Sequence, residues 1–97
     1  MYKMVVLYTR PEDPEAFDAA YAEHLKLVEK VPGSAGYTVT KFNKTLAGQE
    51  LYLMFEMRFA SKEDMKTGMN SPEMAAVGKD SRRFSANLHS ILLGAEE

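Results

Sequence analysis

The nine-residue segment Leu51–Phe59 constrains the fold of this chain more than any other part of the sequence. Its odd-numbered positions are all apolar, and this alternation is typical of a β-strand with one buried face. The other face combines two large apolar side chains with two charged ones, namely Tyr52, Met54, Glu56 and Arg58. Large apolar side chains such as Tyr52 and Met54 are not expected on a strand face that is exposed to water. We therefore expect other elements to cover at least part of both faces.

Three further segments have the length and composition of β-strands. The apolar run Met4–Tyr8 is rich in β-branched and aromatic residues and stops shortly before Pro11. The segment Tyr37–Asn43 is joined to Leu51–Phe59 by a glycine-containing loop, which predicts an antiparallel hairpin. The short apolar segment His89–Leu93 is expected to form a final strand.

A helix is predicted between the first two strands. Asp13 is a good N-cap because its carboxylate can accept hydrogen bonds from free backbone N–H groups, and Pro14 fits the first helical position. Pro32 and Gly33 end the helix. One face of this helix is apolar apart from a single histidine, with the residues Phe17, Ala20, Tyr21, His24, Leu27, Val28 and Val31.

A second helical region lies between the third and fourth strands. Ser61 and Asp64 have the spacing of a capping box, and Ser71 followed by Pro72 is a second helix-opening signal. An apolar stripe at helical spacing follows, with Met74, Val77, Ser81, Phe84 and Leu88.

The order strand, helix, strand, strand, helical region, strand predicts a single α+β domain over residues 1–97. It is the split βαβ (β-α-β-β-α-β), ferredoxin-like arrangement, a four-stranded antiparallel sheet with helices on one face. The opposite face of the sheet is too apolar to remain in water. We therefore expect a homodimer in which two sheets pack face to face and close into a dimeric α/β barrel.

Composition excludes several classes of function. The chain has no cysteine, so disulfides, thiolate metal sites and cysteine nucleophiles are absent. A net charge of −2 argues against nucleic acid as a partner. No apolar run approaches the roughly 20 residues that cross a bilayer, and the N-terminus lacks a signal-peptide pattern, so we expect a cytoplasmic protein without a membrane partner. Two distant histidines and no phosphate-binding loop predict neither a metal nor a cofactor.

His24 is the side chain most suited to chemistry. It lies in the apolar stripe of the first helix and should point at the sheet, where an imidazole can act as acid or base near neutral pH. Tyr21 lies one turn away on the same face, and is the expected catalytic partner. Four aromatic residues are candidates to line a pocket between helix and sheet, namely Tyr8, Phe17, Tyr37 and Tyr52. The alternative for each is purely structural: a core histidine satisfied by a backbone carbonyl, and aromatic residues that pack the core.

Several segments resemble the EthD family, which takes its name from ethyl tert-butyl ether degradation. They are Val5–Asp13, Phe17–Tyr21, Glu23–Gly33, Tyr37, Ser61–Met65 and Asn70–Met74, and together they span nearly the whole chain. The resemblance implies the dimeric α/β-barrel superfamily, whose members include small cofactor-free monooxygenases, muconolactone isomerases and, more distantly, haem proteins. It also implies a recurrent histidine at the position of His24. The family often has proline after the His-Leu pair, where this chain has Lys26.

Three functional hypotheses remain open from the sequence. In the first, the protein serves small-molecule catabolism as a cofactor-independent oxidoreductase (monooxygenase-like) or isomerase, with His24 transferring a proton of a small hydrophobic or aromatic, oxygenated ligand. In the second, the same pocket belongs to a non-catalytic dimeric ligand-binding protein or to an accessory protein of an oxygenase system. In the third, the chain is a purely structural dimer whose pocket is filled by tyrosine and methionine side chains.

Overall fold

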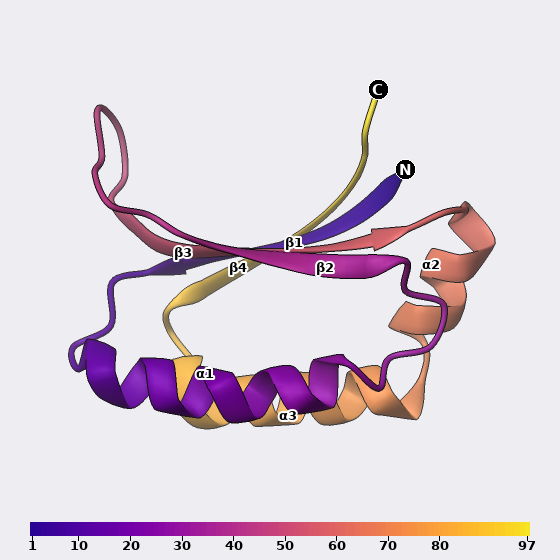
Figure 1. Ribbon diagram of the computed structural model, residues 1–97, viewed down its shortest axis with the longest axis horizontal. Coiled ribbons are helices and arrows are strands. Elements are labelled where there is room, and N and C mark those ends of the chain that lie inside the picture. The colour runs from indigo at the N-terminus through magenta and orange to yellow at the C-terminus, as the bar shows by residue number, and fades with distance from the viewer.

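A computed structural model describes residues 1–97 as a four-stranded antiparallel sheet with helices packed on one face (Figure 1). The elements are β1 (Tyr2–Thr9), α1 (Pro14–Val28), β2 (Gly36–Lys41), β3 (Leu51–Phe59), α2 (Lys62–Met69), α3 (Pro72–Ser85) and β4 (His89–Ala95). The strands are ordered β2-β3-β1-β4. The predicted ferredoxin-like order is confirmed, and the second helical region consists of two helices, as its two helix-opening signals predict.

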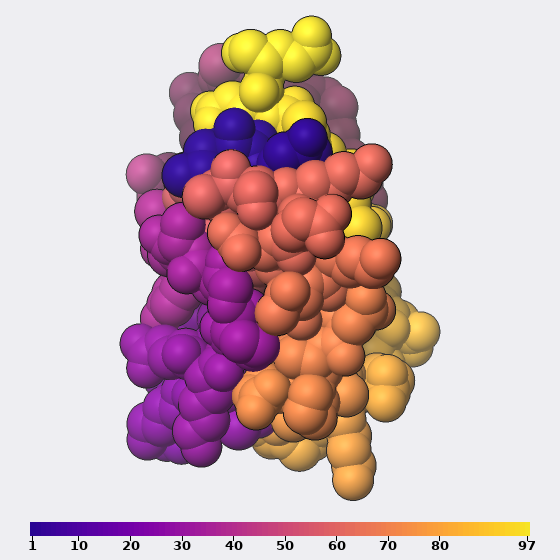
Figure 2. Space-filling model, turned by 90° about the vertical axis from the view of Figure 1, so that its right-hand side faces the viewer, coloured from indigo at the N-terminus to yellow at the C-terminus, as the bar shows by residue number.

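The helices lie in a single layer beneath the sheet. Helices α1 and α3 run side by side, and α2 lies at one end of the sheet (Figure 1). In the end-on view α1 and the loop that follows it lie beside α2 and α3 below the strands (Figure 2). None of the three helices has both the length and the apolar character of a membrane-crossing helix.

The three predicted helix caps are present. Asp13 accepts a hydrogen bond from the Ala16 amide at 3.2 Å, and Ser61 and Ser71 cap α2 and α3 in the same way. Helix α1 ends at Val28, four residues before the predicted stop at Pro32. Gly33 then has a φ of +79°, and a Cβ at this position would lie 2.7 Å from the Asp64 carbonyl oxygen, so the loop passes α2 closely only because it carries glycine.

The inner face of the sheet forms the core together with α1 and α3. Strand β1 pairs with β3 so that Val6 lies beside Phe55 and Met4 beside Met57, and all four side chains are buried. Opposite them, the helices contribute buried apolar residues at three-and-four spacing, which are Phe17, Tyr21 and Val28 of α1 and Met74 and Val77 of α3.

The prediction that Tyr52 lies on the face opposite Leu53 was wrong. Tyr8 pairs with Leu53 and Thr9 pairs with Leu51, so Tyr52 is an extra residue in a β-bulge. The bulge turns the Tyr52 side chain to the helix side, where its hydroxyl donates a hydrogen bond of 2.8 Å to Asp18 of α1. Two consecutive residues of β3 are therefore buried at this point.

The outer face of the sheet carries no helix. Its central part combines the half-buried apolar side chains of Val5, Leu7 and Met54 with an ion pair of 3.1 Å between Lys3 and Glu56. The edge strand β4 exposes three consecutive apolar side chains, Ile91 (54%), Leu92 (49%) and Leu93 (58%). The outer face of the sheet and the edge strand β4 are thus apolar regions of the surface.

Candidate functional site

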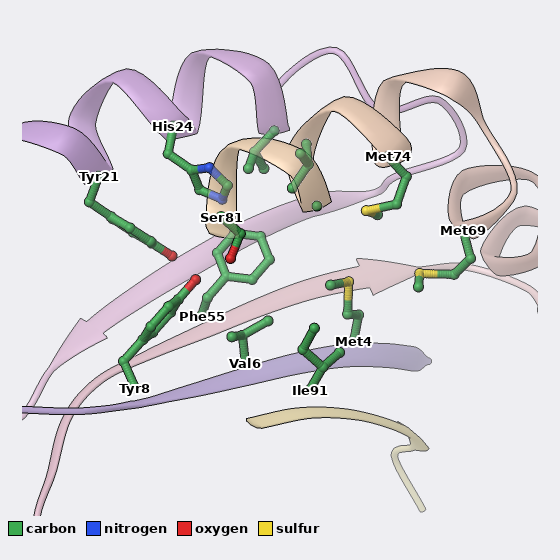
Figure 3. Close-up of a pocket in the computed structure, with 13 residues that line it drawn as sticks. Met4, Val6, Tyr8, Tyr21, His24, Phe55, Met69, Met74, Ser81 and Ile91 are labelled. Carbon is green, nitrogen blue, oxygen red and sulfur yellow. The ribbon is translucent and has the colours of Figure 1, made fainter. Parts of the chain in front are cut away.

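A cavity of about 140 Å³ lies between the sheet and helices α1 and α3 (Figure 3). Ten of its 13 lining residues are hydrophobic. The lining comprises Met4, Val6, Tyr8, Tyr21, His24, Val28, Phe55, Met69, Met74, Val77, Gly78, Ser81 and Ile91. The few polar groups come from Tyr8, Tyr21, His24 and Ser81, so any chemistry in this cavity depends on these side chains.

His24 borders the cavity from α1 and is only 3% exposed. It follows Tyr21 by one helical turn, which places both side chains on the face of α1 that looks toward the sheet (Figure 3). Its Nδ1 lies 2.9 Å from Oδ2 of Asp80 on the neighbouring helix α3. A buried histidine is thus paired with a carboxylate, and not with a backbone carbonyl.

Asp80 determines the state of this imidazole. Burial acts to raise the pKa of Asp80, but hydrogen bonds from Arg83, at 2.9 Å, and from His24 outweigh it and hold that pKa below its ordinary value. The carboxylate is therefore ionised near neutral pH, and Nδ1 of His24 carries a hydrogen that it donates to Asp80. Nε2 is left with a lone pair and is the nitrogen of this imidazole that is free to act as an acceptor.

The Tyr8 and Tyr21 hydroxyls point toward one another at one end of the cavity (Figure 3). The Tyr21 hydroxyl is buried and has no hydrogen-bond partner in the chain. Burial raises the pKa of both phenols, so both hydroxyls remain protonated at physiological pH. The Tyr21 hydroxyl is thus a hydrogen-bond donor for which the chain supplies no acceptor, whereas the Tyr8 hydroxyl interacts with the side chains of Tyr21 and Ser81.

Three hydrogen-bonded polar residues, Ser81, Ser85 and His89, lead from the cavity toward β4. Ser85 Oγ donates to the Ser81 carbonyl at 2.7 Å, so the Ser81 hydroxyl, 3.1 Å away, donates to Ser85 Oγ. His89 Nδ1 donates to the Ser85 carbonyl at 2.7 Å. Ser81 therefore offers the cavity an acceptor oxygen, and His89 is fixed as the Nδ1–H tautomer when neutral.

The structure brings together Tyr8, Tyr21 and His24 from the residues proposed on sequence grounds. The other three lie outside the lining. The Phe17 ring packs behind the cavity, 5.6 Å from the Tyr21 ring and parallel to it. Tyr37 stacks on Phe55 and donates to Glu29, while Tyr52 is bound to Asp18.

Sequence reasoning missed Asp80 and assigned Ser81 only to the helical stripe. Asp80 follows the buried Val77 by three residues and precedes the partly buried Phe84 by four, so it lies on the same side of α3 as these two residues. That spacing is the only signal in the sequence. A carboxylate is normally expected at the surface, and its partner is on another helix 56 positions away. Nowhere does the chain bring together three side chains of the kinds that bind metal ions.

The chain matches the EthD domain over residues 9–87. It belongs to the EthD family. A solved EthD family protein of Bacillus halodurans C-125 is 35% identical, with a TM-score of 0.92, and the comparison covers 100% of this chain and 99% of that one. An uncharacterised 11.0 kDa protein of Rhodococcus erythropolis, from the thcB-thcC intergenic region, is 29% identical over 100% of this chain and 96% of its own length.

Two more distant structures share the fold of this EthD family chain. SnoaB, a cofactor-independent oxygenase from Streptomyces nogalater, is 12% identical with a TM-score of 0.72, covering 99% of this chain and 92% of SnoaB. A dimeric ferredoxin-like protein of unknown function from Jannaschia sp. CCS1 is also 12% identical, with a TM-score of 0.74 and coverage of 99% and 100%. At this identity the likeness establishes the ferredoxin-like fold alone.

Proposed function

We propose that this EthD family protein binds a small hydrophobic or aromatic, oxygenated compound in the cavity and that His24 transfers a proton of that compound. The reaction class is a cofactor-free isomerisation or oxygenation in small-molecule catabolism. The observation that carries the proposal is the pairing of His24 with Asp80 at the wall of a mostly apolar cavity. Titratable groups held in such clefts are candidates for acid–base roles.

The size of the cavity limits the ligand. A closed apolar cavity of roughly 150 Å³ is large enough for benzene. A volume of about 140 Å³ therefore suits a single six-membered ring or a short branched chain. The apolar lining favours such a compound because its burial removes hydrocarbon surface from water.

The chemistry starts with Nε2 of His24 as base. It accepts a proton from a hydroxyl or from a C–H next to a carbonyl, which leaves an anion on the ligand and an imidazolium beside Asp80. Return of this proton to a different carbon completes an isomerisation without any further reactant. In an oxygenation the same anion supplies electrons to O₂, the co-reactant that a cofactor-free oxygenase needs.

The rival function is ligand binding without chemistry, including an accessory role in an oxygenase system. The observation that favours it is the apolar nature of most of the lining, since ten of 13 residues have no acid–base group. This rival requires saturable binding without product. The experiment below separates the two functions.

We propose in addition that two copies of the chain associate through the outer faces of their sheets. Three half-buried apolar side chains, Val5, Leu7 and Met54, form the centre of this face, and no helix covers them. A two-fold arrangement would bury the same patch on both copies. Beside the patch, Lys3 and Glu56 form an ion pair of 3.1 Å.

Isomerisation of 3-cyclohexen-1-one to its conjugated isomer tests the acid–base role. The probe is a one-ring ketone with an acidic C–H, and its product is followed by ultraviolet absorbance. We expect the wild-type chain to accelerate the reaction and His24→Gln to lose about a hundredfold or more of the acceleration, the usual contribution of a general base. Asp80→Asn should lose about tenfold or more, because it removes the charge that stabilises the imidazolium.

Asp18→Asn is the matched control for Asp80→Asn. It also removes a carboxylate of a helix, but Asp18 pairs with Lys41 and Tyr52 away from the cavity, so the rate should not change. An equal rate in wild type and His24→Gln contradicts the acid–base role. Saturable binding of the ketone with no acceleration by the wild type favours the rival function.

A further inference from the structure

The Tyr21 hydroxyl is a buried polar group that the fold leaves unused. The residue is 4% exposed, and its oxygen has no hydrogen-bond partner in the chain. It is the only buried side-chain nitrogen or oxygen that lacks a hydrogen-bond partner. Because an unpaired buried hydroxyl destabilises a folded protein, such a group in a native structure calls for a partner from outside the chain.

The position of this hydroxyl gives the cavity two unlike ends. Tyr21 and Tyr8 direct their oxygens into one end, close to His24 and Ser81, whereas Met69 and Met74 lie toward the other (Figure 3). The Tyr52 hydroxyl, also on a buried tyrosine beside α1, is by contrast satisfied by Asp18 at 2.8 Å. The unpaired oxygen thus occurs where the cavity is, and not wherever a tyrosine is buried.

We infer that Tyr21 binds the oxygen atom of a small mono-oxygenated ring compound, a phenol or a cyclic ketone, whose hydrocarbon part lies among the methionines. The inference rests on the proposed function in taking the cavity as a ligand site, and it adds the class and the orientation of the ligand. In this orientation the ring atoms next to the oxygen lie nearest to His24, because Tyr21 and His24 are neighbours on one face of α1.

The same contact gives Tyr21 a direct part in the reaction. When His24 removes a proton from an α-carbon or a hydroxyl, the negative charge moves to the ligand oxygen. A donor that is already oriented toward that oxygen stabilises the anion without reorganisation. Since burial raises the pKa of the Tyr21 phenol, the hydroxyl keeps its hydrogen and stays a donor throughout.

Binding of phenol and toluene to the full chain tests this inference. The two ligands have the same shape, and only phenol carries an oxygen. The quantity measured is the ratio of the toluene Kd to the phenol Kd, obtained by calorimetry for the wild type, Tyr21→Phe and Tyr37→Phe. Comparing ratios removes the difference in hydration between the two ligands, which is the same for all three proteins.

We expect the ratio to fall about tenfold in Tyr21→Phe, as for the loss of one buried hydrogen bond, while toluene binding is retained. Tyr37→Phe is the matched control because its hydroxyl donates to Glu29 outside the cavity, and its ratio should equal that of the wild type. Retained toluene binding also shows that Tyr21→Phe is folded.

Two results would overturn the inference. One is an unchanged ratio in Tyr21→Phe, which would mean that water or another group satisfies the hydroxyl. The other is the lack of saturable binding of both ligands to the wild type. A normal isomerisation rate in His24→Gln together with a lowered ratio in Tyr21→Phe would refute the acid–base role alone and leave the oxygen-binding role of Tyr21 intact.

Discussion

The buried tyrosines Tyr21 of α1 and Tyr52 of β3 differ by a single hydrogen bond, and this difference predicts opposite effects of the same mutation. Tyr52→Phe removes a hydroxyl that donates to Asp18 at 2.8 Å, so it should lower the free energy of unfolding by about 1 kcal/mol. Tyr21→Phe removes a hydroxyl without a partner and should raise it by roughly 1 kcal/mol in the ligand-free protein. Urea unfolding of the two variants checks this, and a similar loss in both would refute it.

Asp80 predicts a pH dependence of stability. Its pKa is held below the ordinary value in the folded state, so at acidic pH the unfolded chain binds the proton more readily than the folded one. The stability that this carboxylate contributes is therefore complete above about pH 4, the ordinary aspartate value, and is lost as the pH falls through the lower folded pKa. Urea midpoints between about pH 3 and 6 should fall less steeply in Asp80→Asn than in wild type. Parallel curves would show that Asp80 is not responsible.

At the scale of residues, the sequence led to Tyr8, Tyr21 and His24 of the polar site but not to Asp80. His24 was found because it interrupts an apolar stripe at helical spacing, and Tyr21 because it lies one turn away in the same stripe. Both signals depend only on local geometry. Asp80 was missed because its role depends on the contact between α1 and α3, two helices separated in the chain by the β2–β3 hairpin and helix α2. No local pattern distinguishes a carboxylate that faces another helix from one that faces water.

At the scale of elements, two helical glycines have opposite surroundings. A Cβ on Gly68 of α2 would lie 2.7 Å from the Phe59 ring and 2.9 Å from the Pro32 carbonyl oxygen, whereas one on Gly78 of α3 would meet nothing within 4 Å. Gly68→Ala should therefore destabilise the protein by about 1–3 kcal/mol through overpacking. Gly78→Ala should stabilise it by roughly 0.5–1 kcal/mol because alanine is the better helix former. Thermal unfolding of the two variants measures the contrast, and equal Tm changes would contradict it.

The elements themselves were largely readable from the sequence, and the exceptions have physical causes. Caps such as Asp13 and Ser71 are side-chain signals at fixed spacing, so the helix starts were predicted correctly. The face of Tyr52 in β3 was predicted wrongly because a bulge adds one residue at this point. A strict alternation of faces holds only in a strand without a bulge. The bulge leaves no mark in the composition of the strand.

At the scale of the whole molecule, the outer face of the sheet predicts a dimer. Light scattering of the wild type should give twice the chain mass of 10.9 kDa. Leu7→Lys places a charge in the centre of the proposed interface and should shift the mass to that of a monomer, because burying an unpaired charge is costly. Leu46→Lys is the control, since Leu46 is 88% exposed at the tip of the β2–β3 loop. A wild-type mass of one chain would refute the dimer.

The ferredoxin-like arrangement followed from the order of the elements, because few topologies connect this order without crossing. The cavity could not be predicted in the same way. Its volume is the space that Val6, Phe55 and the methionines leave between two layers, and a change of one side chain fills or empties it.

A crystal structure of the chain with phenol at saturating concentration tests most directly whether this cavity is a ligand site beside His24. The expected result is one phenol in the cavity, its oxygen within hydrogen-bonding distance of the Tyr21 hydroxyl and its ring next to the His24 imidazole, with the His24–Asp80 contact retained. A cavity filled by protein side chains, or phenol bound only elsewhere, would contradict both the ligand site and the chemistry assigned to it.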